Sequence, residues 1–341
     1  MKSLYITRYG GPDVLQLREE ADPSPAAGKV RIRVQRAGLN FAEVSARVGL
    51  YPDAPKPPMV AGYEVSGVVD ALGSGATRVR EGDRVLAFTH FGGHSDTVIV
   101  DEIFAARLPE AMSFEEAAAL PVNYLTAFHM LFHVHVLKPG EKVLVHSAAG
   151  GVGQAVIQLS KQVEDVELFG TASASKHAFL REAGVHHPID YRSVDYAEEV
   201  RRLTQGRGVD LVLDALGGPD WSKGYDLLAP AGQLICFGWA NMVQSETRNV
   251  FRVVNQLVRQ RRFAPMGLME ANRTVSGVNM GRMWSEAALL HRHLDRLLEL
   301  YENGRIKPHV DKVFALSQAA DAHRYMQERR NVGKIVFDCT R

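Results

Sequence analysis

The stretch "EKVLVHSAAGGVGQAVIQL", residues 141–159, decides the fold of this chain. "EKVLVHS" is the short apolar run of a buried strand, and "GVGQAVIQLSKQV" has its apolar positions at helical spacing. The turn between them fits the G-x-G-x-x-G pattern of dinucleotide-binding folds except at its first glycine, where Ala148 stands. Gly150, Gly151 and Gly153 leave room for backbone N–H groups to approach a pyrophosphate at the helix N-terminus. The alternative is an ordinary strand-turn-helix.

Strands and helices alternate after this turn. The strand-like runs include "VELFGT", "VDLVLDAL", "GQLICFG" and "TVSGVN", with helical patterns between them, and this order predicts βαβ units around a parallel sheet. Before residue 120 the apolar runs are short and broken by Gly and Pro, which predicts a mostly β domain. Helices are expected over 249–263, 285–304 and 317–330, and "GKIVFD" is expected as a last strand. We therefore predict an α/β chain of two domains: residues 1–122 with 282–341, and residues 123–281.

Composition narrows the function classes. The chain has 341 residues, a formal net charge of +1 and two cysteines. The balanced charge argues against nucleic-acid binding, and two cysteines cannot build a disulfide framework or a structural zinc cluster. No run of 18 apolar residues occurs, so no membrane-spanning helix is expected. A soluble, cytoplasmic protein acting on small molecules fits best.

The second expected strand carries information about the cofactor. Enzymes that select NAD place an acidic residue about 20 residues after the glycine turn, to bind the ribose 2′-hydroxyl. Here that strand ends in Gly170 and Thr171, with no carboxylate to repel a 2′-phosphate. Ser173, Lys176 and Tyr191 are candidates to hold that phosphate, although Lys176 is equally explained as a solvated lysine at a helix start. The sequence favours NADPH, and a single dinucleotide turn leaves no site for a flavin.

Several stretches together carry a resemblance to a known family. "AGLNFAEVSARVGLYP" (37–52), "AGYEVSGVV" (61–69), "VREGDRVLAF" (79–88), "SAAGGVGQAVIQLSK" (147–161) and "LDALGG" (213–218) are similar to the zinc-free, zeta-crystallin-like quinone oxidoreductases of the medium-chain dehydrogenase/reductase superfamily. "GTASASKH", "HPIDY" and the tail "GRIKPHVDKV…RRNVGKIV" resemble the subfamily typified by the vesicle amine transport protein homologue.

The resemblance implies a GroES-like β domain and a doubly wound Rossmann domain, with the C-terminal segment returning to the first and the active site in the cleft between them. It implies that "AAGGVG" is an NADPH turn despite Ala148. The residues expected to contact the cofactor are Asn40, Thr126, Ala149, Gly150, Gly151, Val152, Gly153, Ser173, Lys176, Tyr191, Leu216, Phe237, Gly238, Ala240, Asn331 and Lys334.

The resemblance also indicates how the reaction proceeds without a metal. Zinc-dependent relatives carry a G-H-E-x-x-G motif and a catalytic cysteine, whereas this chain reads Gly62-Tyr63-Glu64 and has its cysteines elsewhere. Tyr51 and Asn40 match the residues that face the cleft, and they are the expected catalytic donors to the acceptor oxygen. For Tyr51 the alternative is a loop tyrosine packed on neighbouring prolines. Glu64 and Glu43 are also expected near the cleft, without a general-acid role.

Two further patterns admit more than one reading. His129, His133 and His135 have metal-like spacing, but Met130 replaces the glutamate of a zinc protease, so packing or surface histidines explain them better. Residues 241–272 form a long excursion in which 249–263 combine an apolar face with four arginines. This stretch fits a lid over the substrate or a dimer interface better than a peripheral membrane contact.

The predicted function is NADPH-dependent, metal-free hydride transfer to a quinone or an α,β-unsaturated carbonyl, by a homodimer. The alternative is an NADPH-binding protein with weak catalysis that acts at a membrane surface or as a scaffold.

Overall fold

The computed structural model describes residues 1–243 and 246–341, and the chain folds into two compact units. The first unit is Met1–Leu125, Ser245–Arg248 and Met280–Arg341, and the second is Thr126–Gln244 and Asn249–Asn279. Gln244 and Ser245, which belong to the 241–272 excursion, lie outside the described residues.

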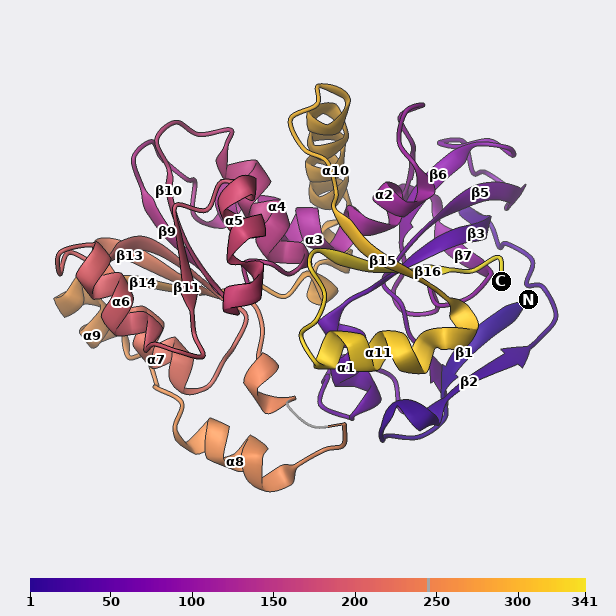
Figure 1. Ribbon diagram of the computed structural model, residues 1–341. Helices are drawn as coiled ribbons and strands as arrows, with labels where there is room; N and C mark the ends of the chain where they lie inside the picture. The colour runs from indigo at the N-terminus through magenta and orange to yellow at the C-terminus, as the bar shows by residue number, and fades with distance from the viewer. Residues whose placement is uncertain (244–245) are drawn as a thin grey trace. The chain divides into compact units, whose positions relative to one another are not determined.

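The first unit is built on a seven-stranded sheet in which β15, β16, β3, β5, β6 and β8 follow one another and β7 also pairs with β3. The apolar and polar residues of β3 alternate, so that one face of the strand is buried. Figure 1 shows the C-terminal strand β16 beside β3, in antiparallel register. The strands are β3 (Lys29–Leu39), β5 (Glu64–Leu72), β6 (Arg84–Phe88), β7 (Thr97–Asp101), β8 (Ala105–Arg107), β15 (Val310–Ala315) and β16 (Lys334–Asp338).

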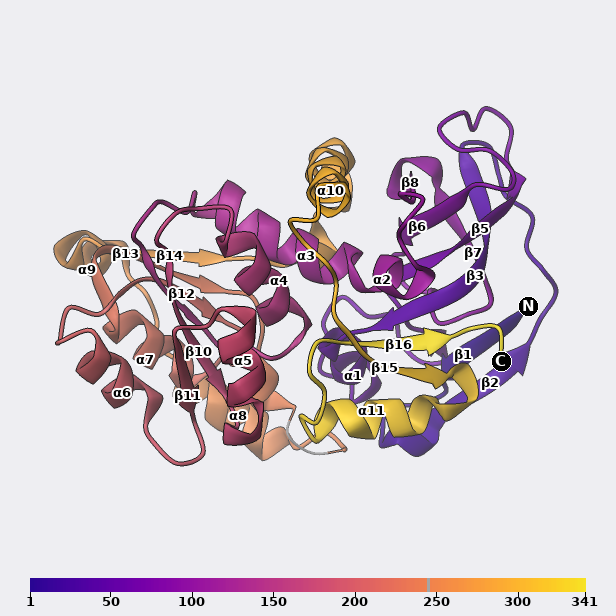
Figure 2. The same ribbon diagram turned by 45° about the horizontal axis from the view of Figure 1, so that its top comes forward.

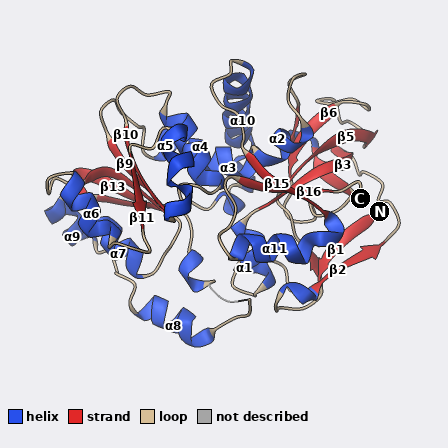
Figure 3. Cartoon of the chain, viewed as in Figure 1, coloured by secondary structure: helices blue, strands red, loops and turns tan. Residues whose placement is uncertain are grey.

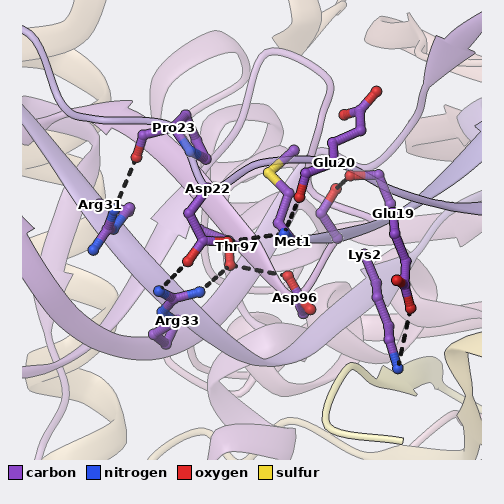
Figure 4. Close-up of polar contacts among 12 residues, drawn as sticks. Met1, Lys2, Glu19, Glu20, Asp22, Pro23, Arg31, Arg33, Asp96 and Thr97 are labelled. Atoms are coloured by element: carbon purple, nitrogen blue, oxygen red, sulfur yellow. Dashed lines mark hydrogen bonds and ion pairs between the residues drawn. The ribbon is translucent and has the colours of Figure 1, made fainter.

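A small sheet in the order β2-β1-β4 holds the N-terminus in this unit. The Met1 ammonium lies 2.8 Å from the Asp22 carboxylate, and Asp22 also pairs with Arg33 of β3 (Figure 4). Arg33 in turn donates to Thr97 at 2.8 Å. These contacts fasten the chain start to the large sheet. The strands are β1 (Lys2–Ile6), β2 (Leu15–Glu19) and β4 (Met59–Val60).

Within the described residues, four α-helices lie wholly in the first unit. The helix expected over 285–304 is α10, whose Leu290, Leu294 and Leu297 are buried at helical spacing. α11 lies against α1 and the strand pair β15–β16, as Figure 2 shows. The helices are α1 (Phe41–Arg47), α2 (Phe114–Ala119), α10 (Ala287–Glu302) and α11 (Ala319–Gln327).

The second unit contains a six-stranded, fully parallel sheet in the order β11-β10-β9-β12-β13-β14. Its strand order reverses between β9 and β12, as expected for a doubly wound sheet, and the predicted fold class is confirmed here. The strands are β9 (Lys142–Val145), β10 (Glu167–Ala172), β11 (His187–Asp190), β12 (Val209–Asp214), β13 (Leu228–Cys236) and β14 (Thr274–Gly277).

Helices cover both faces of this sheet. Figures 2 and 3 show α4 and α5 on one side and α6 and α7 on the other. The helix predicted from residue 121 is α3 (Pro121–Phe128), which continues as a π-helix over His129–Val134. The other helices are α4 (Gly151–Ser160), α5 (His177–Ala183), α6 (Tyr196–Leu203) and α7 (Pro219–Asp226).

The structure corrects the single helix expected over 249–263. α8 (Val250–Val258) ends earlier, and a second helix, α9 (Pro265–Ala271), follows it. Pro265 stands at the start of α9, where a proline costs no helical hydrogen bond, and the residues between the two helices form no helix. The excursion is therefore a pair of short helices.

Candidate functional site

The glycine-rich turn of the second unit lies between β9 and α4, as predicted. Ala148, which replaces the first glycine, is fully buried, and its methyl lies 2.8 Å from the place a Cβ would occupy at Gly170. The Ala148 N–H donates to Thr171 O at 3.1 Å. The methyl therefore packs inside the unit against β10, which explains why alanine is tolerated at this position.

The remaining glycines permit the close approach that this turn requires. A Cβ at Gly153 would lie 2.4 Å from Ala148 O, closer than any side chain can come. Gly150 caps α4, a ten-residue helix whose first N–H groups have no partner within the helix. Ala149, Gly150, Gly151 and Val152 therefore surround a helix N-terminus suited to a pyrophosphate.

The tips of β10 and β11 lie next to each other. Ala172 pairs with Asp190 in parallel register, so Ser173 and Tyr191 follow their strands at the same edge of the sheet. Ser173 Oγ lies 3.3 Å from Ser175 Oγ, and the Lys176 N–H donates to Ser173 O at 2.9 Å. This places the three residues predicted to hold a 2′-phosphate in one region.

A second cation lies at this edge that sequence reasoning missed. The Arg192 guanidinium is 5.9 Å from the centre of the Tyr191 ring. In the sequence, Arg192 could have been proposed as a phosphate ligand because it directly follows Tyr191. An arginine binds phosphate well, so Arg192 joins Lys176 as a candidate for the 2′-phosphate.

A buried carboxylate, that of Asp214, holds the turn that follows β12. Asp214 ends β12, and its Oδ1 accepts hydrogen bonds from the N–H groups of Leu216 and Gly217 at 2.6 and 2.9 Å. Burial raises the pKa of Asp214. His146, at the end of β9, lies with Nε2 3.9 Å from Asp214 and Nδ1 3.1 Å from the Thr171 hydroxyl. The tips of β9, β10 and β12 are thus linked by polar side chains.

Four further residues that were predicted to contact the cofactor lie at the same edge of the sheet. Phe237 N–H donates to Asp214 O at 2.9 Å, and Ala240 N–H donates to Ala215 O at 3.0 Å. A Cβ at Gly238 would lie 2.7 Å from Ala215 O, so the two turns pack closely. Leu216, Phe237, Gly238 and Ala240 therefore belong to adjoining turns at the carboxyl end of the sheet, where doubly wound folds bind dinucleotides. Thr126, at the start of this unit, is buried on α3.

In the first unit, four polar side chains form a buried cluster. Lys334 of β16 pairs with Glu64 of β5 and donates to Asn40 Oδ1. Asn40 Nδ2 donates to Glu64 at 2.9 Å and to Glu43 at 3.3 Å. The Glu64 carboxylate also accepts the Val122 N–H at 2.7 Å. Burial raises the pKa of Glu43 from 4.5 to about 7. We call Asn40, Glu43, Glu64 and Lys334 the buried cluster.

Two residues predicted to contact the cofactor, Asn40 and Lys334, have their side chains engaged in this cluster. Both amide hydrogens of Asn40 point to carboxylates, so Asn40 has no N–H left to donate to an acceptor oxygen. The Lys334 ammonium is 2% exposed and engaged with Asn40 and Glu64. Asn40 is the N-cap residue of α1, and Lys334 donates to its side chain. Asn331 donates to Gly333 O at 2.9 Å.

Tyr51 follows α1 and packs against the core formed by Ile6, Val14, Ala46, Met59 and Ala61. Its ring lies edge-on to that of Tyr63, with centroids 6.0 Å apart. Burial raises the pKa of Tyr51, so the phenol stays protonated at neutral pH. Nearby, Asp53 pairs with Arg282 at 2.7 Å. Tyr51 is thus both a packed residue and a phenol that keeps its proton.

The histidines of α3 and its π-helical continuation, and the two cysteines, were candidates for metal binding. His129 and His133 stack with ring centroids 4.7 Å apart. Within residues 1–243 and 246–341, no group of three or more His, Cys, Asp or Glu side chains could hold a metal ion. Burial raises the pKa of Cys236 to about 12 and that of Cys339 further, so neither thiol is a ready ligand.

Comparison with known proteins agrees with both units. The family described as "Alcohol dehydrogenase GroES-like domain" matches residues 26–126, and that described as "Zinc-binding dehydrogenase" matches residues 183–337. The synaptic vesicle membrane protein VAT-1 homolog of Danio rerio is 46% identical over 98% of this chain and 69% of its own length. A quinone oxidoreductase of Pseudomonas aeruginosa is 33% identical over 98% of this chain and 99% of its own.

A solved structure of similar fold contains NADPH. The quinone oxidoreductase of Escherichia coli, in complex with NADPH, matches with a TM-score of 0.88 and 28% identity over 99% of this chain and 100% of that one. The turn at Ala148 to Gly153 fits the same group, and the prediction of NADPH as cofactor is confirmed. The chain belongs to the medium-chain dehydrogenase/reductase superfamily, the family that its sequence resembles and that includes its VAT-1 and quinone oxidoreductase relatives.

Proposed function

We propose that this protein is an NADPH-dependent, metal-free reductase of quinones or α,β-unsaturated carbonyls, and that Tyr51 donates a hydrogen bond to the acceptor oxygen. NADPH, when bound, supplies the hydride. Reduction places negative charge on the acceptor oxygen, which a metal or a hydrogen-bond donor must stabilise. Tyr51 packs beside α1 with its ring edge-on to that of Tyr63, and this placement of a protonated phenol is the observation that carries the proposal.

Position 63 supports the metal-free mechanism. Zinc-dependent relatives have a histidine ligand at this place in the G-H-E motif, and this chain has Tyr63. A phenol with a pKa raised by burial is a poor zinc ligand, because binding requires its ionised form. Hydrogen-bond donors must therefore stabilise the negative charge on the acceptor oxygen. Tyr51 is the donor we assign, and the buried cluster fixes α1, after which Tyr51 follows.

The second unit supports the choice of NADPH over NADH. β10 ends at Ala172 without an acidic residue at its tip, and Ser173 and Lys176 follow the strand. We propose that Ser173, Lys176, Tyr191 and Arg192 bind the 2′-phosphate. The remaining predicted contacts, from Ala149 to Ala240, would line the rest of the dinucleotide.

The proposal is tested by following NADPH oxidation by the purified protein with a chelator present. The acceptors are ortho-quinones, para-quinones and alkenals, with NADH measured in parallel. We expect turnover with one class of acceptor, faster with NADPH, and unchanged by the chelator. NADPH binding without oxidation of any acceptor would contradict the proposal.

A second function is favoured by a different observation. α8 presents Phe251, Leu257 and Val258 to solvent, with exposed fractions of 91%, 53% and 77%. Arg252 and Arg259 lie on the same helix and its end, so an anionic membrane surface would suit both kinds of side chain. The VAT-1 relatives are named as synaptic vesicle membrane proteins. None of the described helices is both long and apolar enough to cross a bilayer, so any such contact would be peripheral.

This second function is tested with vesicles of phosphatidylcholine alone and with added phosphatidylserine. Binding that requires the anionic lipid and is lost in Phe251→Ser with Arg259→Gln would support it. Absence of binding would leave α8 as a lid or an interface.

We also propose a homodimer, because β14 is the last strand of its sheet and pairs only with β13 within the described chain. The dimer is tested by sedimentation, and a cytoplasmic location by fractionation of cells.

A further inference from the structure

Ser147 begins the cofactor turn in a strained backbone conformation. Its φ is 55°, in the left-handed region that residues with a side chain rarely adopt. Glycine adopts this region without steric cost, yet this chain has a serine here. The Ser147 carbonyl accepts the N–H of Gly150, the residue that caps α4, at 2.8 Å. The conformation of Ser147 therefore helps to fix where α4 begins, and other contacts must hold it.

Thr171 of β10 supplies these contacts. Its backbone O accepts the Ala148 N–H at 3.1 Å, and its Oγ accepts the Ser147 N–H at 3.2 Å. One residue thus ties two consecutive N–H groups of the turn to the parallel sheet. Only the bond to Ser147 involves the side chain, so a substitution can remove it and leave the backbone bond in place.

His146 orients the Thr171 hydroxyl. Its Nδ1 lies 3.1 Å from Thr171 Oγ, its Nε2 lies 3.9 Å from the Asp214 carboxylate, and all three side chains are buried. A neutral imidazole carries its hydrogen on one nitrogen. The carboxylate favours the hydrogen on Nε2, which leaves Nδ1 to accept the hydrogen of the Thr171 hydroxyl. A lone pair of Oγ then accepts the Ser147 N–H, and a hydroxyl that donates a hydrogen bond also accepts one more strongly.

We propose that His146 and Thr171 are positioning residues of the cofactor site: His146 orients the Thr171 hydroxyl, and this hydroxyl holds Ser147 in the left-handed conformation from which the turn starts. The inference rests on the proposed binding of the NADPH pyrophosphate at this turn. Both side chains act through the backbone of the turn rather than by touching the cofactor. They should therefore affect NADPH and NADH alike, because both cofactors carry the pyrophosphate.

Thr171→Val tests the hydroxyl, because valine keeps the shape of threonine and the backbone bond to Ala148. We expect the Kd for NADPH and the Kd for NADH each to rise about two- to tenfold, the worth of one hydrogen bond. Ser147→Gly should restore both values in the Thr171→Val background, since glycine adopts the left-handed conformation without help. Fluorescence titration of the purified protein measures each Kd with no acceptor present.

Two substitutions of His146 separate its hydrogen bond from its packing. Asparagine can accept the Thr171 hydrogen through its amide oxygen, whereas leucine cannot. We expect His146→Leu to raise Kd as Thr171→Val does, with no further rise when the two are combined, and His146→Asn to stay closer to the wild type. Thr204→Val is the matched control, because it removes a buried hydroxyl of the same unit that accepts the Gly208 N–H at 3.1 Å. It should leave both Kd values unchanged.

The outcomes separate this inference from the proposed function. Gly153→Ala with an unchanged Kd would refute cofactor binding at the turn, and this inference with it. A weakened Gly153→Ala together with an unchanged Thr171→Val would leave the turn as the cofactor site and overturn the positioning role. A Thr171→Val loss that Ser147→Gly does not restore, or a loss confined to NADPH, would also overturn it. Equal Kd values in His146→Leu and His146→Asn would overturn the role of His146.

Discussion

The cofactor turn of the second unit is shaped by its backbone, whereas the buried cluster of the first unit is formed by side chains. The turn uses backbone: Gly153 is there because a Cβ would lie 2.4 Å from Ala148 O. The cluster uses side chains that come from positions as far apart as Asn40 and Lys334. A backbone site depends on the spacing of neighbouring residues, whereas a side-chain site depends on the finished fold.

This difference teaches what each region tolerates. The turn accepted an alanine for its first glycine, because the Ala148 methyl finds space inside the unit. The cluster has no such freedom, since each of its members holds another and all four are buried. We therefore expect substitutions in the cluster to affect stability most, and those in the turn to affect cofactor binding.

Lys334→Met should have the largest effect on folding. It leaves the Glu64 carboxylate buried without its cation, which costs about 3–5 kcal/mol of unfolding free energy. Adding Glu64→Gln should recover part of that loss, because a neutral amide is cheaper to bury. Urea denaturation measures both changes. A loss below about 1 kcal/mol in Lys334→Met would contradict the account of a tightly coupled cluster.

Tyr51→Phe should have the next largest effect, on catalysis rather than on folding. Removal of one donor to a developing oxyanion lowers kcat about 100- to 1000-fold. The Kd for NADPH and the Tm should remain those of the wild type. Stopped-flow or steady-state oxidation of NADPH measures kcat, and fluorescence titration measures the Kd. A Tyr51→Phe enzyme with unchanged kcat would reduce Tyr51 to a packing residue.

Gly153→Ala tests the turn. The added methyl meets the Ala148 backbone, so we expect a loss of about 1–3 kcal/mol in stability and NADPH affinity weakened about tenfold or more. Gly267→Ala, on α9 of the same unit, is the matched control, because its Cβ would meet nothing within 4 Å. Equal NADPH affinities in the two variants would show that close approach at residue 153 is not what the turn requires.

Glu43→Gln should have the smallest effect, visible in pH dependence. Burial raises the pKa of Glu43 from 4.5 to about 7, so the native state binds more protons than the unfolded chain between these values. Its contribution to stability is therefore full below pH 4.5 and is lost as the pH rises through 7. Glu43→Gln should flatten this slope in Tm measured from pH 4.5 to 8. An unchanged slope would show that other titratable groups cause the pH dependence of Tm.

The fold was predictable because its signals are local. The strand, turn and helix at 141–159 and the alternation after them are written in neighbouring residues, and the predicted fold class is confirmed. The single helix over 249–263 was wrong, since apolar periodicity continued through residues that form no helix before Pro265. Periodicity shows which residues share a face but does not fix where a helix ends.

The parts of the candidate site that are formed by backbone could be predicted from the sequence. The parts that are formed by side chains from distant positions could be predicted less well. The glycines, Ser173 and Lys176 lie at the strand tips where the motif places them. The engagement of Asn40 and Lys334 with each other needed β16 to pair with β3, which no local pattern shows. Tyr51 was predicted from the sequence, but its position beside the ring of Tyr63 is seen only in the folded unit.

The most direct test of metal-free hydride transfer is a single-turnover oxidation of NADPH, deuterated at the transferred position, by chelator-treated enzyme. The account predicts that the chelated wild type reduces the acceptor with a normal primary isotope effect, and that Tyr51→Phe does so far more slowly. Turnover that disappears with the chelator and returns on addition of zinc would contradict it.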